Sequence, residues 1–242
     1  MPALRRPFRV AALGFMILAL FAQGGATAAP KKDSTAPPFW YGYTYGSSCE
    51  ATDGSTCSRA QTADAATGTL DVQGSVTSPG GGSLPGQGHQ FVGGYVARVV
   101  RVKQDPVSVT VSATFHVLPG TESTTPSPLS QAYNGVGVQL YRRDGSVVCN
   151  ESQAEYVTGS PGVAESFQSP PDLEVTVTAS TCEDEGTPVP MERGWYQAIA
   201  YVWGHAWLGC PVAGENDVCT GDTGTASTRM ATNVPSISLT ST

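Results

Sequence analysis

Several stretches of the chain alternate apolar and polar residues with a period of two. Residues 107–117 do so without a fault, 173–181 repeat the pattern, and 69–77 show it more weakly. Successive side chains of a β-strand point to opposite faces, so this period indicates strands with one buried face. No stretch keeps a 3.6-residue apolar period beyond two turns. The chain is therefore predicted to be all-β, with little or no helix.

Turn and loop signals separate the predicted strands. Strands are expected at 39–45, 69–77, 90–103, 107–117, 136–143, 147–150, 173–181, 195–208 and 229–239. Asp144-Gly145 predicts a type I′ hairpin turn, and Gly93-Gly94 a bulge or bend. Loops are expected at 49–57, 78–88 and 119–128, and an acidic turn at 183–185. This spacing predicts a single antiparallel β-sandwich at 39–242 with Greek-key or jelly-roll connections. The alternative is a domain boundary in the glycine-rich loop.

The first 28 residues have the pattern of a signal peptide. A basic leader with Arg5, Arg6 and Arg9 precedes an apolar run at 10–22, which is too short to span a bilayer. Ala26 and Ala28 fit the small-x-small rule for cleavage. We expect residues 29–38 to form a flexible mature N-terminus, with export by the general secretory route rather than the twin-arginine route. The mature chain is then secreted and has no transmembrane segment; the alternative is an uncleaved membrane anchor.

The chain is acidic. The leader holds three of the 13 Lys and Arg residues and none of the 20 Asp and Glu residues, which leaves a net charge of about −10 after cleavage. Nucleic acids and anionic membranes attract basic surfaces, so neither is an expected partner. The acidity is expected to serve solubility outside the cell.

All six cysteines lie beyond the leader, and an even number in an exported chain predicts three disulfides. Because short loops close most often, we predict Cys49–Cys57 and Cys210–Cys219 and, by elimination, Cys149–Cys182. A zinc site is the rival interpretation, but the chain contains no CxxC pair. No metal ligand is therefore assigned.

The stretch at 195–208, WYQAIAYVWGHAWL, carries the main candidate site. Read with a period of two, it separates small residues and Tyr196 from a set of larger ones. Tyr196 resembles the tyrosine corner of β-sandwiches, which would turn its own face inward. The candidate ligand-binding residues on the other face are Trp195, Tyr201, Trp203, His205 and Trp207. They either stack on sugar rings or anchor a partner, or else they pack the core. The same argument applies more weakly to Trp40, Tyr41, Tyr43 and Tyr45.

Residues 107–202 resemble the bacterial pre-peptidase C-terminal domain. The shared pieces are a strand that ends in the Asp144-Gly145 hairpin and a later strand that opens with Gly194-Trp195-Tyr196. Domains of that family are non-catalytic secreted β-sandwiches, so the resemblance implies such a body here. The six cysteines and the long N-terminal part are not features of that domain.

Catalytic motifs are incomplete. Asp222-Thr223-Gly224 matches the aspartic-protease triplet, but no second copy exists and its flanks are polar, so a turn is expected. No GxSxG elbow accompanies the three histidines His89, His116 and His205. The acidic residues form two clusters without the spacing of a calcium loop: Glu183, Asp184 and Glu185, and then Glu215, Asp217 and Asp222. We predict no catalytic residue and no cofactor, with structural calcium as an open alternative.

The sequence therefore predicts a secreted, non-catalytic module that binds an extracellular glycan or a cell-surface partner. One alternative is a structural or adhesive surface protein without a defined pocket. The other is a secreted hydrolase with a histidine-containing site. The oligomeric state does not follow from the sequence.

Overall fold

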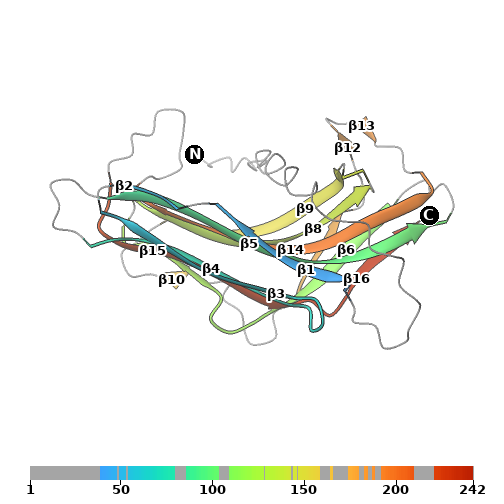
Figure 1. Cartoon of the computed structure of the whole chain (residues 1–242), viewed down its shortest axis with the longest axis horizontal. Coiled ribbons are helices and arrows are strands. Elements are labelled where there is room, and N and C mark those ends of the chain that lie inside the picture. Colours follow the sequence, from blue (N-terminus) through green and yellow to red (C-terminus); the bar gives the residue numbers. More distant parts are fainter. Residues whose placement is uncertain are drawn as a thin grey trace, which may run out of the picture. The chain divides into compact units, whose positions relative to one another are not determined.

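The structure is a computed structural model, and the residues that it describes belong to one compact unit, Thr35–Thr242. It describes residues 39–241 except 48, 53, 80–85, 104–108, 128, 143, 146, 159–163, 166–173, 180–182, 185–186, 189–191 and 210–220. The predicted signal peptide and flexible N-terminus at 1–38 lie outside this range. Every regular element among the described residues is a β-strand (Figure 1). No helix in this part of the chain has the length and hydrophobicity needed to cross a membrane.

Six strands form the first sheet, here called sheet A. They are β1 (Tyr41–Gly46), β2 (Glu50–Thr52), β5 (Gln87–Val102), β8 (Gln131–Arg142), β9 (Val147–Thr158) and β14 (Gly194–Leu208). Their order is β1-β5-β14-β8-β9, with β2 pairing β5 beyond the end of β1. All pairs are antiparallel, and β14 is the central strand, bonded to β5 on one side and β8 on the other. The stretch that the sequence marks as most aromatic thus lies at the middle of this sheet.

Eight strands form the second sheet, sheet B. They are β3 (Thr56–Asp64), β4 (Thr69–Ser78), β6 (Val109–Val117), β7 (Glu122–Thr124), β10 (Ala164–Glu165), β11 (Glu174–Ala179), β15 (Gly224–Asn233) and β16 (Ile237–Ser241). The path β10-β7-β15-β4-β3 carries β6 as a branch from β15, and β6 also pairs β11 and β16. A small two-stranded sheet joins β12 (Glu183–Asp184) to β13 (Thr187–Pro188).

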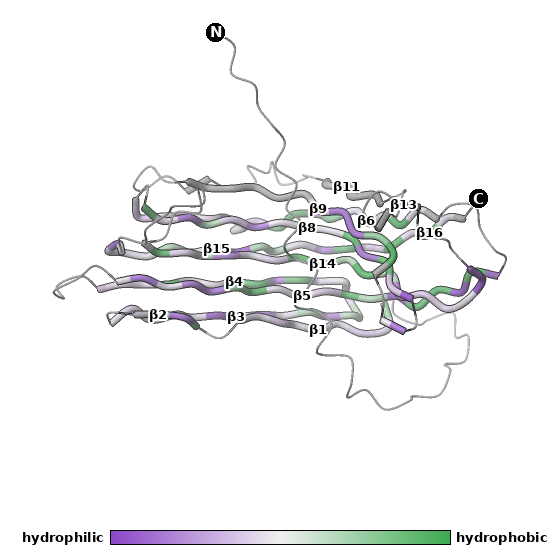
Figure 2. The backbone as a smooth tube through the Cα atoms, turned by 90° about the horizontal axis from the view of Figure 1, so that it is seen from above, coloured by the Kyte–Doolittle hydropathy of each residue, from purple (hydrophilic) through white to green (hydrophobic). Residues whose placement is uncertain are grey.

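The two large sheets pack face to face around a large hydrophobic cluster and a smaller one formed by Val76, Ala206, Leu208 and Ala226. Strand β4 shows how the sequence directs this, because its buried and less buried residues alternate along its whole length. Figure 2 shows the same alternation of hydropathy along the neighbouring strands. The fully buried side chains include Leu70, Val72, Val96, Phe115 and Met230. Burial of this apolar area is the main force that holds the sheets together. The fold is therefore an antiparallel β-sandwich, as the period-two pattern predicts.

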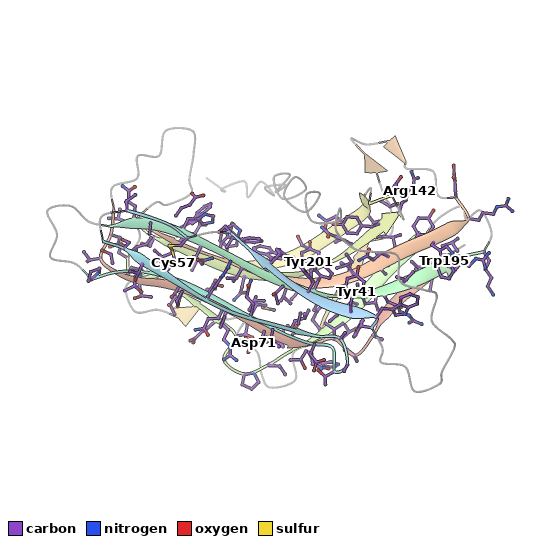
Figure 3. The ribbon with its side chains drawn as sticks, in the orientation of Figure 1. Tyr41, Cys57, Asp71, Arg142, Trp195 and Tyr201 are labelled. Carbon is purple, nitrogen blue, oxygen red and sulfur yellow. A yellow bond between two sulfur atoms is a disulfide. The ribbon has the colours of Figure 1, made fainter. Side chains whose placement is uncertain are left out.

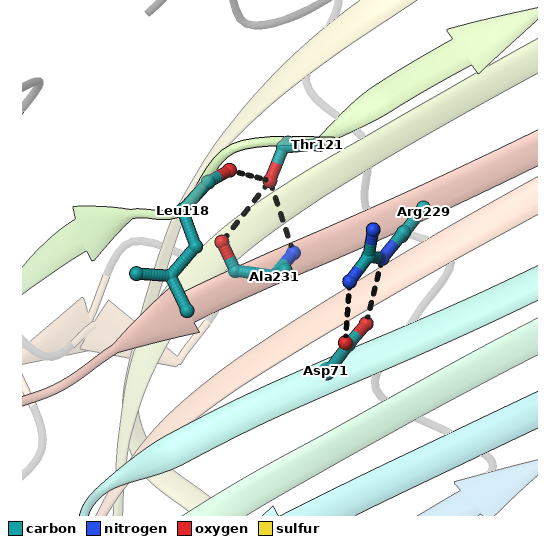
Figure 4. Close-up of polar contacts among 5 residues, drawn as sticks. All are labelled: Asp71, Leu118, Thr121, Arg229 and Ala231. Atoms are coloured by element: carbon teal, nitrogen blue, oxygen red, sulfur yellow. Dashed lines mark hydrogen bonds and ion pairs between the residues drawn. The ribbon is translucent and has the colours of Figure 1, made fainter. Parts of the chain in front are cut away.

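Polar side chains stabilise the outer face and the loops of sheet B. Arg229 on β15 forms a bidentate ion pair with Asp71 on β4, at 3.1 and 2.7 Å (Figure 4). The buried Thr121 hydroxyl donates to the carbonyl oxygens of Leu118 and Ala231, and it accepts from the Ala231 amide. Thr121 thereby satisfies backbone groups where the chain leaves β6 and passes β15.

The structure corrects several boundaries. Residues 56–64, left without a strand by the sequence, form β3 at the edge of sheet B, and β7 lies inside the predicted loop at 119–128. Both are short of apolar residues, so neither shows the apolar alternation by which the other strands were predicted. Of the bulge or bend predicted at Gly93-Gly94, the bulge is wrong, because β5 pairs β1 and β14 through both glycines without a shift in register. The irregularity lies instead between Leu140 and Tyr141, where β8 faces β9.

The disulfide Cys49–Cys57 is confirmed and joins sheet A to sheet B next to β2 and β3. Cys149 is also disulfide-bonded, and it lies buried on β9. Cys182, Cys210 and Cys219 lie outside the described residues, so the pairings Cys149–Cys182 and Cys210–Cys219 stay predictions.

Replacing Cys57 by Ala is expected to lower the free energy of unfolding by about 2 kcal/mol. The bridge closes a loop with a sequence separation of 8, and loops that short give the lower end of the usual disulfide contribution. Urea unfolding of the variant and of the wild-type protein measures the difference. An unchanged midpoint would show that the strands hold this corner without the bridge.

Candidate functional site

The outer face of sheet A is covered by aromatic rings, which we call the aromatic face. Its members come from four adjacent strands: Tyr41, Tyr43 and Tyr45 of β1, His89, Phe91 and Tyr95 of β5, Tyr201, Trp203, His205 and Trp207 of β14, and Tyr133 and Tyr141 of β8. They point outward because the alternate residues of the same strands, such as Val96, Val136 and Val202, lie in the core between the sheets. Figure 1 shows that this face of the sheet is concave.

The orientation predicted for β14 is confirmed by Tyr196. Its hydroxyl donates to the Glu192 carbonyl oxygen at 2.6 Å and accepts from the Glu192 amide at 3.2 Å. This bond to the backbone four residues upstream is the arrangement of a tyrosine corner. Tyr196 and the following small residues therefore face the core, and the larger set faces outward.

Glycines make room for the rings on this face. In the strand register Trp203 stands between Gly93 of β5 and Gly135 of β8, and Tyr201 stands beside Gly137. A Cβ atom at Gly137 would overlap the Tyr201 ring and would lie 2.7 Å from the Glu151 carbonyl oxygen. The Tyr201 ring thus lies across Gly137, and the Tyr45 ring of β1 lies across Gly93, an arrangement known to compensate for glycine in sheets.

Most rings of β14 and β8 are packed rather than open. Tyr201 is 7% exposed and Trp203 4%, while Trp207 and His205 are half-buried. Their contacts are mainly edge-to-face, as between Trp203 and Tyr133 at 5.2 Å and 78°, although His205 stacks on Tyr133 at 4.7 Å and 9°. Of the five candidate residues predicted on this strand, only Trp195 is clearly exposed, at 44%. The packed rings of β14 and β8 therefore form the surface of sheet A itself and leave little ring area free for a ligand.

Besides Trp195, the open rings of this face belong to β1, a strand that the sequence pattern supported more weakly as a site. Tyr41 is 36% exposed and Tyr43 41%, and both rest on the buried ring of Tyr95, with centroids 6.0 and 5.7 Å away. Gln197 of β14 donates to the Tyr41 hydroxyl, so the Tyr41 ring extends across β5. Two exposed rings, two residues apart on one strand, thus lie on a fixed support, and we call Tyr41 and Tyr43 the tyrosine platform. Tyr41 is labelled in Figure 3. The strand order, which the sequence does not reveal, is what places them beside β5.

Polar groups line the opposite side of the same face. The Tyr201 hydroxyl donates to the Asn150 Oδ1 atom at 2.8 Å, and the Tyr141 hydroxyl donates to the Gln139 Oε1 atom at 2.7 Å. Burial raises the pKa of Tyr141 to about 12 and that of Tyr201 further, so both hydroxyls stay protonated donors. Asn150 and Ser152 are exposed. The face therefore combines flat apolar rings with amide and hydroxyl groups.

Two histidines share one hydrogen bond within the aromatic face. His89 Nε2 and His205 Nδ1 are 3.0 Å apart, and His205 also contacts Phe91 with ring centroids at 4.4 Å. Burial lowers the pKa of His205 to about 3, with a further contribution from His89, and burial also lowers the pKa of His89. Because both pKa values are lowered from 6.5, both rings are neutral at pH 7, and one ring donates the shared hydrogen to the other.

The other predicted chemical groups serve structural roles or lie outside the described residues. Asp222 is buried and accepts hydrogen bonds from the hydroxyls of Ser127 and Ser130, at 2.5 and 2.6 Å, and from the Thr223 amide. His116 is exposed on β6, away from the His89–His205 pair. Within the described ranges, no three His, Cys, Asp or Glu side chains come together as a metal site. Glu185, Glu215 and Asp217 of the acidic clusters fall in gaps.

No family model and no curated protein sequence matches the chain. Among solved structures, a carbohydrate-binding module of the β-sandwich superfamily aligns with 80% of this chain at 14% identity and a TM-score of 0.26. The chain spans 56% of that protein's length. A xylan-binding module aligns with 76% of this chain and 96% of its own, at 12% identity and a TM-score of 0.27. A carbohydrate-binding module in complex with β-1,4-galactotriose aligns with 77% of this chain and 88% of its own, at 6% identity and a TM-score of 0.25.

These scores are too low to carry an argument about this protein. The sandwich is established by its own strand pairing, and the site by its own geometry. No match supports the resemblance of residues 107–202 to the pre-peptidase C-terminal domain specifically.

Proposed function

We propose that this protein is a secreted, non-catalytic module that binds an extracellular glycan on the outer face of sheet A. The observation that carries the proposal is the tyrosine platform: Tyr41 and Tyr43 are exposed on one strand and held on the buried Tyr95 ring. Same-face neighbours on a strand are about 7 Å apart, so an extended chain of sugars can lie along both rings. Fixed aromatic rings bind with little loss of conformational entropy.

The polar side of the face supports the same ligand class. A sugar presents an apolar ring face together with several hydroxyls, and it is bound best by flat apolar groups with a few placed hydrogen-bonding groups. Gln139, Asn150 and Ser152 lie on the same face as the tyrosine platform, across the width of the sheet. Their amides and hydroxyls both donate and accept, as sugar hydroxyls require.

The proposal assigns a different role to each aromatic layer. Tyr201 and Trp203, predicted from the sequence as ligand contacts, are the rigid base, and the tyrosine platform makes the contact. Trp195 stays a proposed contact at the far end of β14. The Cys49–Cys57 bridge fits an extracellular location, in which disulfides persist.

A glycan array followed by titration calorimetry tests the proposal. The Tyr43→Ala variant is expected to bind the selected glycan roughly tenfold more weakly, since a stacked ring contributes about 1 kcal/mol or somewhat more. Tyr43→Phe keeps the ring and is expected to bind like the wild-type protein. Leu129→Ala is the matched control, because Leu129 is 42% exposed in the loop before β8. The absence of glycan binding, or equal loss in both alanine variants, would contradict the proposal.

A further inference from the structure

The described basic residues gather at one end of the sandwich, although the chain as a whole is acidic. Seven Lys and Arg residues are described beyond position 38. Arg59 and Arg229 lie elsewhere, while the other five lie where β5 and β8 end and β14 begins: Arg98, Arg101, Lys103, Arg142 and Arg193. Figure 3 shows Arg142 and Trp195 at this end of the strands. We call these five residues the basic end.

The strand register explains the clustering. Arg101 pairs Trp195 across β5 and β14, and Arg142 pairs the next residue, Tyr196, across β14 and β8. Arg98, Arg101, Lys103 and Arg193 are exposed. Arg101 is the one of these residues that pairs Trp195 and shares its outer face, and Lys103 follows directly after β5. Arg98 and Arg142 lie on the inward side of their strands, and the Arg98 guanidinium donates to the Ile237 carbonyl oxygen of β16. The chain's formal net charge of −7 does not cancel the charge at Arg101 and Lys103, because salt screens interactions beyond about 8 Å.

Trp195 adds an exposed aromatic ring to the basic end. Its ring is 44% exposed, and the Arg101 guanidinium lies 5.6 Å from its centroid. Both side chains belong to the outer face of sheet A, the face that carries the tyrosine platform. Tyr41 pairs Ala97, four residues before Arg101 on β5, which is about 13 Å along the strand. One extended ligand can therefore reach both the tyrosine platform and the basic end.

We infer that the ligand is an acidic polysaccharide, whose carboxylate or sulfate groups bind at Arg101 and Lys103 while a sugar ring stacks on Trp195. This inference rests on the proposed function and adds the ligand class. Arginine suits such a ligand because its planar group forms paired hydrogen bonds with carboxylate or sulfate. An anionic membrane would also bind a basic surface. The exposed Trp195 ring on the same face as the tyrosine platform favours a polysaccharide, because sugar rings stack on flat aromatic groups.

The test uses paired polymers that differ in charge. Polygalacturonate is compared with its full methyl ester, and dextran sulfate with dextran, by titration at low and at physiological salt. We expect the charged member of at least one pair to bind at least tenfold more tightly, and the gap to narrow as salt rises. The carboxylate and sulfate arms distinguish the two sources of charge. Equal affinity within both pairs would overturn the inference.

Matched variants locate the effect. Arg101→Gln is expected to weaken binding of the charged polymer on the order of fivefold, and Arg59→Gln, which removes the same charge from β3, is expected to leave it unchanged. Equal losses would show general electrostatics and overturn the assignment. The inference would also be overturned if the protein bound phosphatidylglycerol vesicles in an Arg101-dependent way but bound neither charged polymer.

The outcomes for the two proposals are separable. If neutral glycans bind and Tyr43→Ala weakens them, while charge makes no difference, the proposed function holds and the inference fails. If charged polymers bind through Arg101 and Tyr43→Ala has no effect, the basic end acts alone and the tyrosine platform is not the glycan site.

Discussion

The Gly137→Ala variant is expected to lose about 3 kcal/mol of unfolding free energy and to disturb the aromatic face. The added Cβ would overlap the Tyr201 ring and approach the Glu151 carbonyl oxygen to 2.7 Å. The carbonyl belongs to the paired strand β9, so it cannot move aside without disturbing the ladder. Overpacking of this kind costs about 1–3 kcal/mol, and loss of the Tyr201–Asn150 hydrogen bond adds to it.

Gly194→Ala is the matched control for this prediction. Gly194 lies at the start of β14 on the same sheet, and the nearest atom to a Cβ there is Tyr196 Cε2 at 3.9 Å, an ordinary contact. We expect its urea midpoint to equal or slightly exceed that of the wild-type protein, because alanine restricts the unfolded chain. If both variants unfold at the same urea concentration, the Tyr201 ring is not confined as described.

Acid is expected to destabilise the protein through His205. The pKa of His205 is about 3 in the folded protein and near 6.5 when the chain is unfolded. On acidification the unfolded chain therefore binds the proton first, so this part of the stability is complete above about pH 6.5 and is lost as the pH falls toward 3. Between pH 7 and pH 4 this one group is expected to remove about 3 kcal/mol.

His205→Phe isolates the contribution. Phenylalanine keeps a ring against Tyr133 and Phe91 but cannot titrate, so the stability of this variant is expected to fall less between pH 7 and pH 4. The neighbouring His89, whose pKa is also lowered by burial, remains in both proteins, so its contribution cancels in the comparison. His116→Phe, at an exposed position on β6, is expected to keep the wild-type pH profile. Parallel profiles for all three proteins would contradict the buried neutral state of His205.

Period-two patterning predicted the sandwich because burial of one strand face leaves a direct trace in the sequence. Residues Val111, Ala113, Phe115 and Val117 of β6 are buried as expected, and Tyr196 faces the core as its corner motif predicts. Polar strands leave no such trace, which is why β3 and β7 were missed. The glycine pair Gly93-Gly94 suggested a bulge that does not form, because hydrogen bonding to strands on both sides keeps those glycines in the ladder.

The candidate site was harder to predict because exposure depends on which strands become neighbours. From the sequence, Trp203 was the stronger candidate for a ligand contact and Tyr43 the weaker one. The fold gives Trp203 neighbours on both sides at the centre of the sheet and places Tyr43 at its edge. The clustering of Arg101 and Arg142 arises in the same way, from registers that join residues far apart in the chain.

The position of β1 links recognition to local opening of the protein. Within sheet A this strand pairs only β5, and it is the first strand of the described chain. Edge segments open with smaller free energies than central ones. Amide hydrogens of 41–46 should thus exchange with deuterium earlier than those of β14, and a bound ligand should slow them. An affinity tag, a fusion or a proteolytic cut just before Phe39 would therefore affect β1, the strand that carries the tyrosine platform.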